Sequence, residues 1–155
     1  MEIRYKSVNQ LDHIEFLELL TNSTLAERRP VHDEAKIRGM CENANLIIEA
    51  RENGRLVGIA RSITDFHYCT YLSDLAVDSS FQKSGIGKEL INRTKAEAPG
   101  AMLILLSAPT AVGFYEKIKM RRYEGCFVEG LSRFFEHPLN ISFKRHWNRI
   151  ATYLI

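Results

Sequence analysis

The chain has 155 residues, enough for one domain with a sizeable hydrophobic core. Its composition, 45% hydrophobic and 26% charged, is that of an ordinary globular protein, and a net charge of +2 with scattered basic residues argues against a nucleic-acid-binding protein. Three cysteines, far apart and without a C-x-x-C pair, argue against a disulfide framework and a structural zinc site.

The N-terminal part of the chain predicts a strand, a helix, a loop and a second helix. Residues 2–8 alternate apolar and polar side chains, which is typical of a half-buried strand. Residues 9–23 show helical spacing, residues 24–33 predict a loop with one proline and two arginines, and residues 34–44 predict a second short helix. The apolar residues expected on one face of the first helix are Leu11, Ile14, Leu17 and either Leu19 or Leu20.

Three strand-like segments follow, over residues 45–53, 55–65 and 67–78. Asn53 and Gly54 lie between the first two segments, and this dipeptide is typical of a tight hairpin. The connection between the second and third segments is also short. We therefore expect a meander of antiparallel strands.

A crossover follows the meander. Residues 85–97 predict a helix with one apolar face, and the apolar run over residues 101–108 predicts a buried strand. A strand, a helix and a strand in this order imply that the two flanking strands pair in parallel. Residues 110–119 predict a short helix and residues 121–130 a last strand.

The C-terminal segment, residues 131–155, predicts another helix. Phe143, Trp147, Ile150 and Leu154 follow one another at steps of four, three and four, so they share one helix face. Such a face covers either the domain's own core, which we favour, or a partner subunit, which would make the protein a homodimer. The expected class is α+β with a mixed sheet.

A glycine-rich turn joins the meander to the next helix and reads SSFQKSGIGKEL, from Ser79 to Leu90. Backbone N–H groups at a helix start are unpaired and carry the positive end of the helix dipole, so this turn is suited to bind a phosphate or pyrophosphate. Two common phosphate motifs do not match. Gln82 stands where a Walker loop has its first glycine, and Leu90 stands where a dinucleotide fingerprint has its third.

The pattern that remains, Q-x-x-G-x-G, resembles the acyl-CoA-binding signature of the GNAT superfamily of N-acetyltransferases, [RQ]-x-x-G-x-[GA]. The order of the elements strengthens the resemblance, as does FYEKIKMRRYE, residues 114–124, which is similar to the family's lYeklGF stretch. The resemblance covers roughly residues 2–129 of a single domain over residues 1–155. It implies a GNAT-like α+β fold, with a mixed, largely antiparallel central sheet flanked by helices. Residues 130–155 would be a C-terminal helical extension.

The resemblance implies that acetyl-CoA is the co-substrate and that no metal is needed. In this family the strand before the motif splays away from its parallel neighbour, and the pantetheine arm of acetyl-CoA lies in the gap. Backbone groups of Leu75, Ala76 and Val77 would then contact the pantetheine and the thioester. The residues expected around the pyrophosphate are Gln82, Lys83, Ser84, Gly85, Ile86, Gly87 and Lys88.

The implied reaction is direct attack of a neutral amine on the thioester carbonyl in a ternary complex. Tyr115, which matches the tyrosine of the family, would donate a proton to the departing CoA thiolate, although aromatic packing also explains a tyrosine there. Asp74 is the first candidate for the base, and a bond to the neighbouring loop explains it equally well. If strand alternation holds, Asp74 shares a face with Leu72 and Ala76. The alternative candidates for the base are Asp65, His67 and Tyr68.

Two positions depart from the pattern of the family. Ala108 stands where many members have an asparagine that bonds to pantetheine, and Ser107 or a backbone group is the candidate to replace it. Lys119 and Met120 stand where glycine and phenylalanine are usual, so the chain must turn there without glycine.

The acceptor is least defined by the sequence. Arg28 and Arg29 are suited to bind a carboxylate or phosphate on the acceptor, and Tyr68 is a further candidate, whereas a solvated loop is the simpler explanation for the arginines. We expect the primary amine of a small molecule. Protein amino groups are an alternative acceptor, and an acyl-CoA-binding module without turnover is an alternative function.

We expect a cytoplasmic protein without nucleic-acid or membrane partners. The first ten residues lack the apolar stretch of a signal peptide, and the longest apolar run, residues 101–106, is too short to span a bilayer. The basic C-terminal segment leaves nucleic-acid binding as an alternative, which salt-dependent binding would reveal.

Overall fold

The structure, a computed structural model, describes residues 2–129. The chain divides into two compact units, Met1–Arg121 and Arg122–Ile155, and the helices and strands among the described residues belong to the first. The C-terminal helical extension that the sequence predicts over residues 130–155 lies outside the described residues.

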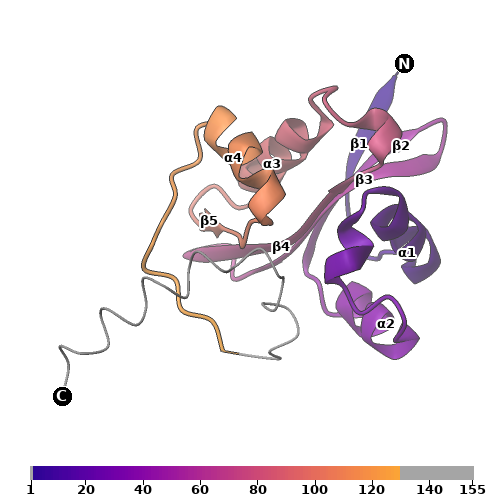
Figure 1. The fold of residues 1–155 in the computed structure, drawn as a ribbon, viewed down its shortest axis with the longest axis horizontal. Coiled ribbons are helices and arrows are strands. Elements are labelled where there is room, and N and C mark those ends of the chain that lie inside the picture. Colours follow the sequence, from indigo (N-terminus) through magenta and orange to yellow (C-terminus); the bar gives the residue numbers. More distant parts are fainter. Residues whose placement is uncertain (1, 130–155) are drawn as a thin grey trace. The chain divides into compact units, whose positions relative to one another are not determined.

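A five-stranded sheet forms the centre of the first unit, with the strands in the order β1-β2-β3-β4-β5 (Figure 1). The strands are β1 (Ile3–Val8), β2 (Leu46–Glu52), β3 (Arg55–Thr64), β4 (Cys69–Val77) and β5 (Met102–Ile104). Each of the first four strands is antiparallel to its neighbour, whereas β4 and β5 are parallel. The α+β class, the meander and the parallel pairing across the crossover are thereby confirmed.

Helices cover both faces of the sheet, α1 and α2 on one face and α3 and α4 on the other (Figure 1). The helices are α1 (His13–Asn22), η1 (Leu25–Arg28), α2 (Glu34–Glu42), η2 (Ser79–Phe81), α3 (Ile86–Glu97), η3 (Pro109–Ala111) and α4 (Val112–Lys117), where η marks a short 3-10 helix. Phe16 of α1 and Ile37 of α2 belong to one core cluster, and Ile86 and Leu90 of α3 belong to the other. The sheet therefore separates two hydrophobic cores.

Local sequence explains where several elements begin and end. Asp12 caps α1, because its Oδ1 accepts hydrogen bonds from the N–H groups of Ile14 (2.8 Å) and Glu15 (2.9 Å). Asn53 and Gly54 have φ angles of 48° and 86°, so both adopt the left-handed conformation that a two-residue hairpin requires. The predicted hairpin between β2 and β3 is confirmed.

Three details of the sequence-based expectation are wrong. Ile14 is 66% exposed, because the buried face of α1 is formed by other residues. These residues are Phe16, Leu19 and Leu20. The run over residues 101–108 forms a strand only at Met102–Ile104. Met102 of this strand is 55% exposed, because its neighbour Leu103 is the residue that packs on the core under α3. Residues 121–129 form no strand; they are exposed and pair with no described strand.

Candidate active site

Strands β4 and β5 separate after a short contact. They pair over three residues of each strand, with Tyr71 opposite Ile104 as the last pair. β4 then continues to Val77, whereas residues 105–108 belong to no strand. In the described part of the chain, the edge of β4 beyond Tyr71 that faces away from β3 has no strand partner, so its backbone groups are open to a ligand. This stretch of β4 contains Leu75, Ala76 and Val77.

The glycine turn follows β4 and places free N–H groups at the start of α3. Lys83 (φ 63°) and Gly85 (φ 92°) adopt left-handed conformations, and Gly85 is the N-cap of the helix. No residue among 2–129 accepts a hydrogen bond from the backbone N–H groups of residues 83–88, and the first bond of the helix runs from Glu89 N–H to the Gly85 carbonyl oxygen (3.1 Å). A run of unpaired donors at the positive end of a helix is suited to bind an anion.

Two contacts hold the turn against the end of β4. The side-chain amide of Gln82 donates to the carbonyl oxygen of Val77 (Nε2 to O, 3.0 Å). A Cβ atom on Gly87 would lie 3.3 Å from Cζ of Phe114 and 3.8 Å from Cγ2 of Val77, so glycine allows the Phe114 ring to approach the first turn of α3. Gln82 and Gly87 therefore assemble the turn, and Phe114 of α4 helps to close it. Sequence reasoning missed this contact of Phe114, because no spacing signal marks it.

Tyr115 of α4 is half-buried beside Phe114. The two ring centroids lie 5.1 Å apart with an interplanar angle of 71°. Burial raises the pKa of the Tyr115 hydroxyl, and the positive charge of Arg28 lowers it in part. Because the net shift is upward, Tyr115 keeps its proton at neutral pH, as a proton donor must. Arg28 is the last residue of η1.

Asp74 is fully buried between two arginines. Its Oδ1 accepts a hydrogen bond from Nε of Arg29, and its Oδ2 accepts one from Nε of Arg61. Arg29 also donates to the carbonyl oxygens of Arg28 and Ser73, each at 2.8 Å, and Arg61 donates to Oγ of Ser73 at 2.8 Å. The structure thus brings Arg29 and Asp74 together, and they bond to each other.

A β-bulge at Ser73 changes the side to which the following residues point. The register of β3 and β4 shifts by one residue there. Leu72 consequently packs in the core under α3, while Ala76 packs in the core under α1 and α2, and Asp74 lies on the same side as Ala76. The expectation that Asp74 shares a face with Leu72 is therefore wrong, because strict alternation does not allow for a bulge.

The other candidates for a base or an acceptor contact lie at the opposite end of β4. Tyr68 is 75% exposed and precedes the strand. Oδ1 of Asp65 accepts hydrogen bonds from the backbone N–H groups of Cys69, Tyr68 and His67 (3.0, 2.8 and 2.9 Å), and these bonds lower the pKa of Asp65 to about 2. Asp65 therefore closes a turn. The structure does not bring Asp65, His67 or Tyr68 next to the glycine turn.

Hydrogen bonds and backbone angles characterise the two positions that depart from the pattern of the family. Oγ of Ser107 donates to the carbonyl oxygen of Ala108 (2.8 Å), so this hydroxyl already has a partner for its proton. Lys119 has φ 64° and ends α4 in a Schellman motif, with the N–H of Met120 bonded to the carbonyl oxygen of Tyr115 (3.0 Å). The chain thus makes the expected turn with lysine in the position usually taken by glycine.

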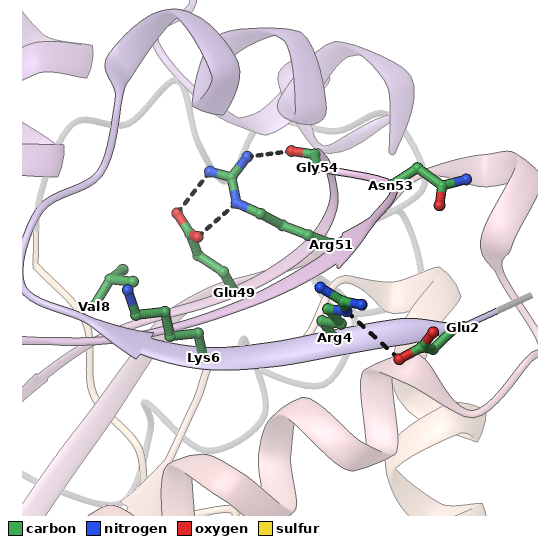
Figure 2. Close-up of a pocket in the computed structure, with 8 residues that line it drawn as sticks. All are labelled: Glu2, Arg4, Lys6, Val8, Glu49, Arg51, Asn53 and Gly54. Atoms are coloured by element: carbon green, nitrogen blue, oxygen red, sulfur yellow. Dashed lines mark hydrogen bonds and ion pairs between the residues drawn. The ribbon is translucent and has the colours of Figure 1, made fainter.

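A separate hollow of about 470 Å³ lies along β1 and β2, at the other edge of the sheet (Figure 2). Figure 2 shows Arg51 between Glu49 and the carbonyl oxygen of Gly54, and an ion pair between Arg4 and Glu2. The charges around this hollow are thus largely paired with one another. None of the candidate residues lines it, so we place no candidate site there.

Metal and membrane features were expected to be absent. Residues 2–129 contain no group of three or more His, Cys, Asp or Glu side chains placed to hold a metal ion. None of the described helices combines the length and the apolar stretch that a membrane crossing requires.

Comparisons with known proteins point to one family. A family model described as an acetyltransferase (GNAT) domain matches residues 17–134. An uncharacterised N-acetyltransferase of Pyropia yezoensis is 28% identical over 121 residues, which cover 74% of this chain and 68% of that protein. A GNAT family acetyltransferase of Streptococcus pneumoniae has a similar structure, with a TM-score of 0.71 at 20% identity over 85% of this chain and 99% of that one. An acetyltransferase of Trypanosoma brucei has a TM-score of 0.60 at 26% identity, over 84% and 100% of the two chains.

Proposed function

The chain belongs to the GNAT acetyltransferase family, and on that basis we propose that it transfers an acetyl group from acetyl-CoA to a primary amine of a small molecule. The observation that carries the proposal is the open edge of β4 next to the unpaired N–H groups of residues 83–88. Acetyl-CoA has a thioester and an amide-bearing pantetheine arm at one end and a pyrophosphate further along. A ligand of this shape and charge matches the two features in their order along the chain.

In this proposal the cofactor is held mainly by backbone groups. The pantetheine arm lies along β4 at Leu75, Ala76 and Val77, where its amides replace the missing strand partner. The pyrophosphate lies at the N-terminus of α3, where the helix dipole favours negative charge. The exposed lysines Lys83 and Lys88 add positive charge beside it.

The reaction needs little covalent chemistry from the protein. The amine nitrogen bonds to the carbonyl carbon of the thioester, the C–S bond breaks, and the CoA thiolate leaves with the electron pair. Tyr115 donates the proton that the thiolate takes up. Asp74 has both carboxylate oxygens engaged by arginines, so in this proposal the amine passes its proton to water in the gap.

Arg28 is the residue that we assign to the acceptor. Its charge acts on Tyr115, and among the described residues its guanidinium has no hydrogen-bond or ion-pair partner. Each of the three nitrogens of the Arg29 guanidinium already donates to Asp74, Ser73 or Arg28. Arg28 is therefore the better candidate to bind a carboxylate or phosphate on the amine substrate.

Isothermal titration with acetyl-CoA tests the cofactor site. Lys88 and Lys95 are both exposed on α3, one in its first turn and the other in its last. Lys88→Glu places a negative charge beside the proposed pyrophosphate, and we expect affinity to fall about tenfold or more. Glutamate near a helix N-terminus favours the helix, so the variant should stay folded. Lys95→Glu makes the same change of charge far from the turn and should alter affinity less than about twofold.

An amine panel followed by release of the CoA thiol tests the reaction. Each amine is offered with and without a carboxylate, and we expect the carboxylate-bearing member of a pair to turn over faster. Cofactor binding without turnover of any amine or peptide would instead favour the acyl-CoA-binding module. Turnover confined to peptides would favour protein amino groups, and no binding of acetyl-CoA by the parent protein would contradict the proposal.

A further inference from the structure

A buried cluster of charges joins three separate parts of the first unit. Arg29 comes from the loop over residues 24–33, Arg61 from β3, and Asp74 from β4 just after the bulge at Ser73. Asp74 is 0% exposed, and the side chains of Arg61 and Arg29 are 5% and 20% exposed. Three side chains from distant parts of the sequence thus meet in a largely buried position.

The bonds within the cluster are directional. Arg29 donates through Nε to Asp74 and through Nη2 to the carbonyl oxygen of Ser73 (2.8 Å), which the bulge frees from the sheet ladder. Arg61 donates through Nε to the other oxygen of Asp74, through Nη2 to Oγ of Ser73 (2.8 Å), and through Nη1 to a backbone carbonyl oxygen of α2 (3.0 Å). A planar guanidinium makes such a set of bonds, whereas the single ammonium group of lysine does not.

We propose that Arg29, Asp74 and Arg61 form a positioning clamp, in which Asp74 holds the loop over residues 24–33 against the bulge of β4 and takes no proton from the substrate. Arg28 is the direct neighbour of Arg29, and its charge reaches Tyr115. The clamp thereby holds the backbone of Arg28, whose carbonyl oxygen accepts a hydrogen bond from Nη1 of Arg29 (2.8 Å). Its consequence for catalysis rests on the proposed function, whereas the clamp itself does not.

A base would need a different environment. To accept a proton from an amine, a carboxylate must have an oxygen within reach of the substrate and free of other donors. Both oxygens of Asp74 accept from guanidinium groups, and the side chain has no exposed surface. A β-bulge beside an active site commonly re-aims a side chain, and here it turns Asp74 toward the two arginines.

The clamp should affect the binding of one substrate and not of the other. It binds the loop that contains Arg28, the residue proposed to bind the acceptor, while the open edge of β4 and the glycine turn belong to the cofactor side. Loss of the clamp should therefore weaken acceptor binding and leave acetyl-CoA binding unchanged. A cluster that only stabilised the fold would not distinguish the two substrates.

The first measurement is hydrogen exchange of the peptides that cover residues 24–33, in the parent protein and in Arg29→Lys and Asp74→Asn. We expect exchange to become about tenfold faster in both variants, because the loop opens more often, while exchange of β2 stays the same. Arg51→Lys is the matched control, since Arg51 joins β2 to Glu15 of α1 by bonds of 2.8 and 2.6 Å on the same face of the sheet and has no hydrogen bond to residues 24–33. It should leave exchange of residues 24–33 unchanged.

The second measurement is kinetic. Acetyl-CoA affinity by titration should stay within about twofold of the parent in both variants. With an amine that the parent turns over, KM for the amine should rise about tenfold in each variant, and the double variant should be no worse than either single variant. The pH profile of turnover should keep its shape in Asp74→Asn, because Asp74 does not carry the proton.

The outcomes separate the clamp from the proposed function. Unchanged exchange of residues 24–33 in the folded variants would overturn the clamp, whether or not acetyl-CoA binds. Loss of the acidic limb of the pH profile in Asp74→Asn, with normal turnover in Arg29→Lys, would show that Asp74 is the base. If Asp74→Asn does not fold, Arg29→Lys still tests the clamp. Lysine keeps the positive charge and lacks only the planar guanidinium group that donates to several acceptors at once.

Discussion

The cofactor side of the proposed site is formed mainly by backbone groups, whereas the acceptor side is formed by side chains. The cofactor side consists mostly of backbone: the open edge of β4 and the N–H groups of residues 83–88. The acceptor side consists of side chains, with Arg28 next to the clamp of Arg29, Asp74 and Arg61. A backbone site is fixed once the fold forms, whereas the clamp also requires three particular side chains.

This difference predicts where substitutions matter. On the cofactor side most side chains can change without removing a hydrogen-bond donor, so only changes that move α3 or introduce negative charge should be harmful. On the acceptor side a single substitution leaves buried charges without partners. Stability should therefore be most sensitive at the clamp, and cofactor affinity most sensitive at the turn.

The largest expected effect on stability is that of Asp74→Ala. This change leaves Arg61 buried without its carboxylate partner, and removal of one partner from a buried ion pair costs about 3–5 kcal/mol of unfolding free energy. Urea unfolding measures the loss. Asp65→Ala, at an exposed turn, should cost only about 1 kcal/mol. Equal losses for the two variants would contradict the contrast between a buried clamp and a surface turn.

Tyr115→Phe should have the next largest effect, on turnover and not on stability. Removal of the proton donor should lower kcat about 100-fold, with acetyl-CoA affinity unchanged. Because burial raises the pKa of Tyr115, the parent should lose activity only as the pH rises above the usual tyrosine value of about 10, and the variant should lack this limb. Tyr68→Phe, at the far end of β4, is the control and should behave like the parent. Full activity of Tyr115→Phe would exclude Tyr115 as the acid.

A smaller effect on stability is expected when a substitution disturbs the packing of α3 on the sheet. A Cβ atom on Gly58 of β3 would lie 3.0 Å from Cγ2 of Ile86 and 3.2 Å from Cδ1 of Leu90, so Gly58→Val overfills this contact and should cost about 1–3 kcal/mol. Acetyl-CoA affinity should fall with it, because α3 carries the N–H groups of the turn. Gly39→Ala is the matched control in α2, where a Cβ meets nothing within 4 Å, and it should stabilise by about 0.5–1 kcal/mol. Unaltered affinity in Gly58→Val would show that the turn does not depend on this packing.

The features that the sequence predicted are local ones. Asn53 and Gly54 specify their hairpin through backbone conformations that few other residues adopt. Gly85 and Gly87 indicate the turn before α3. The strand, helix and strand around that turn predicted the parallel pair of β4 and β5, because right-handed crossovers leave few other arrangements. Each of these inferences used residues that are close together in the chain.

The features that the sequence did not predict depend on distant partners. Arg29 and Asp74 are 45 positions apart, and no periodicity indicates that they bond. The bulge at Ser73 changes the face of Asp74 without any proline or glycine to mark it. Phe114 approaches Gly87 only because α4 folds back over α3. The acceptor side was the less predictable side, since the clamp depends on such contacts, whereas the cofactor side is mostly backbone and only the contact of Phe114 is of this kind.

The smallest expected effect is at Lys119, where α4 ends. Lys119 has φ 64°, a conformation that costs a residue with a Cβ about 1 kcal/mol and costs glycine almost nothing. Lys119→Gly should therefore raise the unfolding free energy by about 0.5–1 kcal/mol in urea titration. Lys117→Gly, two residues earlier and still helical, should lower it by about 1 kcal/mol. Because the two variants make the same chemical change, opposite signs would establish the left-handed turn that ends the helix carrying Tyr115. A loss of stability in both would show that α4 continues past Lys119 and would contradict the left-handed turn there.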